Sequence, residues 1–142
     1  MYFIGLRDGS PVSVGRMGEF KGEEDLTVNL GTLVSLDENG KLTAFAETAA
    51  PFGVVSSSHK DGVAQEGEEI IVMQTTGDMY LDATVSGTDE QIAALVDGKY
   101  IKATATGVDA SDTSDFCRIV STNGAKTAGD RILVRFEYDN KA

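Results

Sequence analysis

The sequence has 142 residues and a mass of 15.0 kDa, which is the size of one ordinary domain. Hydrophobic residues make up 41% and charged residues 25%, so the chain is expected to fold around its own core rather than stay disordered. The net charge of −11 argues against binding to nucleic-acid phosphates or to anionic membrane surfaces, because both carry the same sign of charge.

The first half of the chain has the pattern of short β-strands. Sixteen glycines recur between short apolar stretches, and only two residues are proline. Residues 1–20 are expected to form either a first pair of strands, turning at Asp8-Gly9-Ser10-Pro11, or an arm that docks on another chain. In the stretch Asp25 to Leu30, apolar and polar residues alternate, which predicts a half-buried strand.

The next stretch predicts a β-hairpin followed by two strands. Residues 33–36 and 42–45 flank a turn in which Asn39-Gly40 would supply the positive-φ conformations. Val54-Val55 follows a Pro-Phe-Gly turn and predicts a short strand. Residues 70–74 are a continuous apolar run, which predicts a strand buried on both faces.

The second half predicts further strands and one helix. The expected strands are residues 79–86, 101–106, 116–120 and 131–138. Thr88 as an N-cap, acidic residues in the first turn and Gln91 at the capping-box position predict a short helix at about 88–96. Loops are expected over residues 56–69, 107–115 and 122–129. The residues therefore predict a mainly β fold with one short helix.

Candidate nucleophiles are few, since the chain has one cysteine and one histidine. This count excludes an intrachain disulfide and a zinc cluster of Cys and His. Ser56, Ser57 or Ser58 could formally complete a triad with His59, but neighbours in one flexible loop are not expected to be preorganised. We therefore expect His59 to be a surface loop residue, and Cys117 to be a small core or interface residue.

Asp109, Asp112 and Asp115 are spaced three residues apart and raise the question of a calcium site. An EF-hand loop needs oxygen ligands at positions 1, 3 and 5, glycine at 6 and an acid at 12, and this segment lacks that spacing. Solvated loop acids are the expected alternative. No metal, cofactor or enzymatic activity is expected.

The N-terminal segment differs from the rest of the chain in charge. Residues 1–21 hold three basic and two acidic residues, against nine basic and 21 acidic residues in the remainder. As an arm, this segment would bury apolar side chains against a partner and offer arginines to its carboxylates. The candidate contact residues are Tyr2, Phe3, Ile4, Leu6, Arg7 and Arg16.

Four glycine-containing motifs and a further glycine, Gly77, lie within roughly residues 25–77. The motifs are Gly31-Thr32-Leu33-Val34, Asn39-Gly40-Lys41-Leu42, Pro51-Phe52-Gly53-Val54-Val55 and Gly67-Glu68-Glu69-Ile70-Ile71-Val72-Met73. This pattern resembles the small phage capsid cement, or head-decoration, proteins. Residues 78–142 extend beyond the smallest members of that family.

The resemblance implies a small β-barrel or tulip-like domain that sits as a homotrimer on the outside of a mature phage head. It implies a structural role, bridging subunits of the major capsid protein and stabilising the virion after synthesis in the host cytoplasm. Residues 1–20 would be a capsid-binding arm or first strands, and residues 21–142 the β-rich decoration domain. The alternatives are another phage virion β-module, such as a tail-tube or baseplate component, or a cellular ligand-binding β-barrel.

Overall fold

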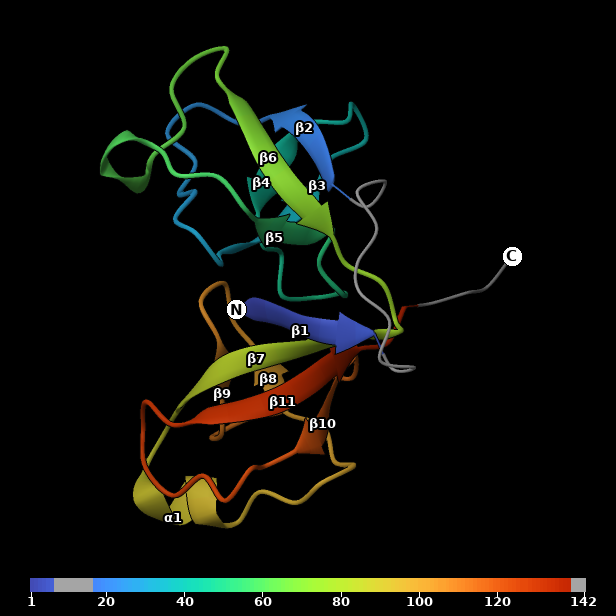
Figure 1. The fold of residues 1–142 in the computed structure, drawn as a ribbon, viewed down its shortest axis with the longest axis vertical. Coiled ribbons are helices and arrows are strands. Elements are labelled where there is room, and N and C mark those ends of the chain that lie inside the picture. The colour runs from blue at the N-terminus through green and yellow to red at the C-terminus, as the bar shows by residue number, and fades with distance from the viewer. Residues whose placement is uncertain (7–16, 139–142) are drawn as a thin grey trace.

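Two β-sheets make up the protein in the computed structural model, which describes residues 1–6 and 17–138. Figure 1 shows them as two lobes, one above the other along the longest axis of the molecule. We call them the five-stranded lobe, built from β2–β6, and the six-stranded lobe, built from β1 and β7–β11. The predicted mainly β fold with one short helix is confirmed.

The five-stranded lobe is a curled antiparallel sheet with strand order β2-β6-β5-β3-β4. Its strands are β2 (Met17–Lys21), β3 (Leu33–Leu36), β4 (Leu42–Ala44), β5 (Gly53–Val55) and β6 (Glu69–Gln74). An isolated bridge joins Gly22 to Leu42, and the N–H of Glu23 donates to the carbonyl oxygen of Leu42 at 3.0 Å. These contacts bring the two edges of the sheet together, so the lobe approaches a closed barrel.

The predicted hairpin is confirmed as β3 and β4, which pair with Leu36 opposite Leu42. Of the two turn residues named from the sequence, only Gly40 has a positive φ, of 79°. The Asp37 carboxylate accepts hydrogen bonds from the N–H groups of Asn39 and Lys41, at 2.8 and 2.9 Å. The turn is therefore held by an aspartate cap as well as by glycine.

One strand prediction in this lobe is wrong, and a second holds only in part. Residues 25–30 form no strand, and although Leu26 and Val28 are buried, Leu30 is 51% exposed. The segment instead hydrogen-bonds to residues 62–64, so its alternation reflects packing against a loop. The second concerns β6: Ile70 and Val72 are buried on one face, but on the other face Met73 is buried while Ile71 is 37% exposed, so that face is only partly covered.

The six-stranded lobe has the order β10-β11-β7-β9-β8, with β1 also pairing with β7. Its strands are β1 (Tyr2–Leu6), β7 (Met79–Ser86), β8 (Lys102–Ala103), β9 (Val108–Asp109), β10 (Cys117–Ser121) and β11 (Arg131–Phe136). The predicted strands over 79–86, 116–120 and 131–138 are confirmed within two residues at each end. The strand predicted over 101–106 is only two residues long, and the loop predicted over 107–115 contains β9.

The predicted helix is α1 (Asp89–Ala93), which is shorter than expected. Thr88 Oγ1 accepts a hydrogen bond from the N–H of Gln91 at 3.2 Å, and Gln91 Oε1 accepts one from the N–H of Thr88 at 2.9 Å. This reciprocal pair is the capping box that the sequence predicted. The loop predicted over 56–69 contains one turn of 3-10 helix, η2 (Lys60–Gly62).

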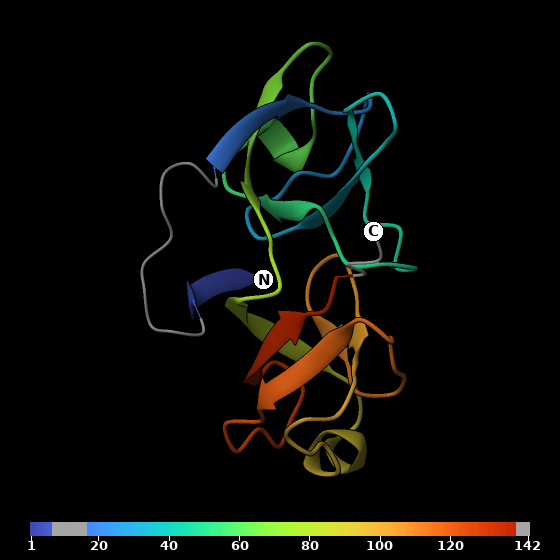
Figure 2. The ribbon, with the colours of Figure 1, turned by 90° about the vertical axis from the view of Figure 1, so that its right-hand side faces the viewer.

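The two lobes share a hydrophobic core. Leu33, Val54 and Met73 of the five-stranded lobe pack in one cluster with Met79 and Leu81 of β7. Hydrogen bonds also cross the junction, including Leu33 N–H to the Ala105 carbonyl at 2.8 Å. Figure 2 shows β1 on the side of the six-stranded lobe that faces the other lobe. The five-stranded lobe has a second, separate core of its own, formed by Leu26, Val28, Val34, Leu42, Val55, Ala64, Ile70 and Val72.

Candidate functional site

The N-terminal contact residues predicted from the sequence fall in and after strand β1. Tyr2, Phe3, Ile4 and Leu6 lie in this strand, which pairs antiparallel with β7 from Tyr2 opposite Asp82 to Leu6 opposite Met79. Among the residues that the structure describes, no strand pairs with the other edge of β1. Arg7 and Arg16 lie outside the described residues. The arm and its role in binding therefore stay predictions.

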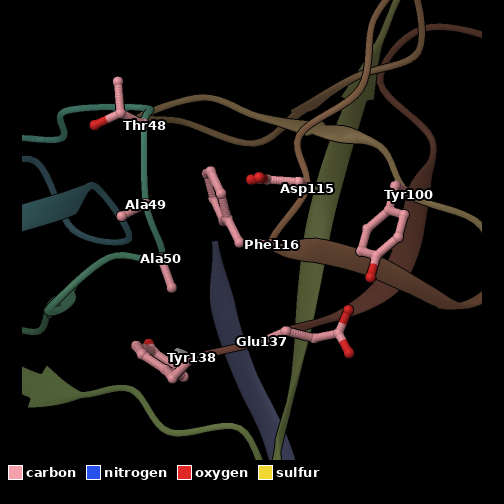
Figure 3. A pocket seen from close by; sticks show the side chains of 8 residues that line it. All are labelled: Thr48, Ala49, Ala50, Tyr100, Asp115, Phe116, Glu137 and Tyr138. Carbon is pink, nitrogen blue, oxygen red and sulfur yellow. The ribbon is translucent and has the colours of Figure 1, made fainter. Parts of the chain in front are cut away.

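A cavity of about 430 Å³ lies between the two lobes. Figure 3 shows its lining: Thr48, Ala49 and Ala50 on one side with Tyr138 below them, and Phe116, Asp115, Glu137 and Tyr100 across from them. The first three come from the connection between β4 and β5, whereas the others come from the six-stranded lobe. The cavity is therefore lined by both lobes and exists only where they pack together.

Tyr138 joins the lobes at the base of this cavity. Its hydroxyl lies 2.8 Å from the carbonyl oxygen of Pro51, the Thr75 hydroxyl lies 3.0 Å from the same oxygen, and the two hydroxyls contact each other. Burial raises the pKa of Tyr138 to about 12. The phenol therefore stays protonated and acts as a hydrogen-bonded connection between the lobes.

A polar group borders the cavity across from the β4–β5 connection. It consists of Tyr100, Arg118 and Glu137. The Arg118 guanidinium lies 4.2 Å from the centre of the Tyr100 ring and donates to the Tyr100 hydroxyl at 2.6 Å. Its Nε and Nη2 donate to Glu137 Oε1 at 3.2 and 3.1 Å. The pKa of Glu137 is lowered, first by a hydrogen bond from Tyr100 and then by the hydrogen bond and charge of Arg118. The carboxylate is ionised but already paired, which suits binding of a polar group better than proton transfer.

The loop at 56–69 holds a hydrogen-bonded chain of three side chains, where the sequence predicted exposure. Ser57 Oγ lies 2.5 Å from His59 Nε2, and His59 Nδ1 lies 2.6 Å from Glu68 Oε1. The His59 side chain is only 3% exposed, so the prediction of a surface histidine is wrong. The serine and the histidine were considered from the sequence, but Glu68 was missed.

The outer face of the five-stranded sheet carries exposed apolar side chains beside acidic ones. Met17 on β2 is 40% exposed and Ile71 on β6 is 37% exposed. Glu19 pairs with Ile71 in the β2–β6 register, and a hydrogen bond with Glu69, followed by the charge of that residue, raises the pKa of Glu19. We call Met17, Glu19, Glu69 and Ile71 the β2–β6 face. Mixed apolar and charged surface of this kind is available for contact with another protein.

Cys117 is fully buried in the core, as the sequence predicted. Asp109 accepts hydrogen bonds from the N–H and hydroxyl of Ser111, at 2.9 and 2.6 Å, and the Ser111 hydroxyl lowers the pKa of Asp109. Across residues 1–6 and 17–138, no three Asp, Glu, His or Cys side chains are placed together as a metal site. In the same part of the chain, no helix has the length and apolar character to cross a membrane.

Three arrangements remain as candidates for function: the outer edge of β1, the β2–β6 face, and the Ser57–His59–Glu68 chain. The first two suit protein contact, whereas the third has the residue types of nucleophilic catalysis. No protein-family model matches the sequence, and no curated protein matches it either.

Proposed function

We propose that this protein decorates the outside of a mature phage head and stabilises it by bridging major capsid subunits. The proposal rests on one observation: the motifs that resemble decoration proteins all fall in the same lobe. The motifs that resemble decoration proteins, within residues 31–73, supply β3, the β3–β4 turn, β5 and β6 of the five-stranded lobe. The resemblance therefore covers a curled sheet with a core of its own.

The surface properties of the chain support a role in assembly. A net charge of −11 keeps free copies soluble at the high concentrations that decoration requires. Repeated weak contacts over a lattice add up to strong attachment without covalent chemistry, and a homotrimer on a threefold position multiplies them further. In this proposal residues Tyr2, Phe3, Ile4 and Leu6 contact the capsid through the outer edge of β1, and Arg7 and Arg16 contact capsid carboxylates.

Co-sedimentation with purified, expanded heads tests the proposal, together with the mass of the free protein by light scattering. Decoration predicts saturable, stoichiometric binding to heads and a threefold arrangement on the particles. Rings or tubes formed by the protein alone would instead identify a tail component. Absence of both binding and self-assembly would contradict every virion role.

A charge-reversal pair makes the test specific to the N-terminal segment. Arg7→Glu should weaken head binding, and the loss should shrink as salt is added, because screening reduces the repulsion. Lys126→Glu is the matched control, since Lys126 is an exposed basic residue in the loop between β10 and β11. Equal loss of binding in both variants would show that net charge matters and that the N-terminal contact does not.

A further inference from the structure

The Ser57–His59–Glu68 chain has the atomic connectivity of a serine hydrolase triad. The serine oxygen contacts Nε2 of the histidine at 2.5 Å, and the carboxylate contacts Nδ1 of the same ring at 2.6 Å. In such a triad the histidine accepts the serine proton through one nitrogen while the carboxylate orients the ring through the other. The serine therefore lies within hydrogen-bond reach of its base, and that base is in turn held by a third group.

The hydrogen bonds around the chain match one proton arrangement, the one that nucleophilic attack by serine uses. A carboxylate that accepts a hydrogen bond from Nδ1 corresponds to the tautomer whose Nε2 is unprotonated. The N–H of Ile71 donates to Ser57 Oγ at 3.0 Å. With one lone pair of Oγ occupied in this way, the serine hydrogen is free to point at the unprotonated Nε2. This is the proton arrangement that nucleophilic attack by serine requires.

The three side chains are held by a fixed backbone, although they lie in a loop. Ser56 N–H donates to the Ile71 carbonyl at 2.8 Å, which attaches the start of the loop to β6. At its other end, Glu68 N–H donates to the Gln65 carbonyl at 3.0 Å, directly before β6 begins. The His59 ring between them is buried, whereas Ser57 and Glu68 are half-buried. The group is therefore preorganised, and its serine lies at the surface.

We propose that Ser57 is a nucleophile that hydrolyses small, uncharged carboxylic esters. Ser57 Oγ attacks the ester carbonyl carbon while His59 Nε2 takes the hydroxyl proton. The bond from that carbon to the alkoxy oxygen then breaks, the alcohol leaves with the proton from Nε2, and Ser57 carries the acyl group. Water attacks the acyl-serine with His59 again as the base, which releases the carboxylic acid and restores Ser57.

The surroundings of the chain select the class of ester. Between residues 57 and 69 there are four acidic residues and one lysine, so an anionic substrate would be repelled. Ile71, whose N–H donates to Ser57 Oγ, is a partly exposed apolar residue (37%) in backbone contact with the nucleophile. A short acyl chain on a neutral alcohol fits both features. This inference is independent of the proposed head decoration.

The first experiment uses the intact protein. It is treated with a fluorophosphonate, which phosphonylates activated serines with loss of fluoride, and the modified residue is mapped by mass spectrometry. We expect modification of Ser57 and not of its exposed neighbour Ser58. In parallel, hydrolysis of p-nitrophenyl acetate should fall at least ~100-fold in Ser57→Ala and stay unchanged in Ser58→Ala, because a positioned base contributes a factor of that order. No modification of Ser57, or equal hydrolysis by Ser57→Ala, would overturn the proposal.

Glu68 is a positioning residue in this scheme, and its test needs a readout besides rate. Glu68→Gln keeps a hydrogen-bond acceptor for Nδ1 but removes the charge that stabilises the imidazolium. Hydrolysis should fall, and the pH at which it is half-maximal should move downward. A purely structural role for Glu68 would change thermal stability and leave the pH profile where it was.

Two cysteine variants keep the proposal testable if alanine at position 57 prevents folding. Ser57→Cys places a thiol beside His59, so its alkylation by iodoacetamide should persist toward about pH 6, because the histidine takes the proton. Ser58→Cys has no such base, and its rate should fall about tenfold per pH unit. The native Cys117 is buried and does not interfere. The same pH dependence for both variants would show that His59 does not activate position 57.

Discussion

The buried thiol of Cys117 should make the protein sensitive to alkali. Cys117 begins β10 and is fully buried, so a thiolate there would have no water around it. Burial raises the pKa of this thiol from 9.0 to about 12. Between these two values the folded protein keeps a proton that the unfolded chain has lost. The free energy of unfolding must therefore decrease as the pH rises through this range.

The size of the effect follows from the width of that range. Each pKa unit corresponds to about 1.4 kcal/mol, so the full loss is ~4 kcal/mol near pH 12 and ~2 kcal/mol at about pH 10.5. The Tyr138 phenol acts in the same direction, since burial raises its pKa from 10.0 to about 12. Because its unfolded-state pKa is one unit above that of cysteine, the phenol lowers the free energy of unfolding by less than ~1 kcal/mol at about pH 10.5. Cys117 therefore dominates the first part of the alkaline decline.

Urea unfolding of the wild type and of Cys117→Ala, at about pH 8 and about pH 10.5, measures the effect. At the lower pH the variant should be less stable by ~1–2 kcal/mol, because alanine leaves a small cavity. Between the two pH values it should lose ~2 kcal/mol less than the wild type, since all other titrating groups are shared. An equal loss in both proteins would refute the assignment of the alkaline decline to the thiol.

Four further substitutions test the fold. Gly53→Ala should destabilise the protein by several kcal/mol, because its Cβ would lie 2.6 Å from the Met73 carbonyl oxygen; Gly40→Ala, with open space but positive φ, should cost only ~1 kcal/mol in urea unfolding. Thr88→Ala should cost ~1 kcal/mol through loss of the capping box, measured by the same method. Tyr138→Phe should cost ~1 kcal/mol and lower the melting temperature, since a hydrogen bond between the lobes is lost.

The elements predicted correctly from the sequence are those whose signal is local. The capping box of α1 and the hairpin turn at Gly40 involve residues within a few positions of each other. Strand β7 alternates along its length and is buried on alternate residues, as half-burial requires. Residues 25–30 carry the same alternation but pair with a loop instead of a strand. An alternation of apolar and polar residues therefore predicts which side chains are buried, but not whether the backbone pairs with a strand or with a loop.

The candidate triad was missed for a related reason. Ser57 and His59 are neighbours in the sequence, but their base-orienting partner Glu68 is nine residues further on in a chain rich in acids. Nothing local distinguishes Glu68 from the other acidic residues nearby. Its position depends on β6, which begins directly after it and anchors both ends of the loop. The loop was expected to be flexible, but hydrogen bonds from Ser56 and to Ser57 attach it to Ile71 of strand β6.

The shared core links the part of the chain that resembles decoration proteins to the part that does not. The resemblance stops near residue 77, yet Leu33, Val54 and Met73, which lie within it, are buried together with Met79 and Leu81 beyond it. Those three side chains would face water if the five-stranded lobe stood alone. Residues 78–142 are therefore part of what stabilises the lobe that carries the resemblance. Because the lobes share this cluster, we expect loss of packing in one lobe to destabilise the other.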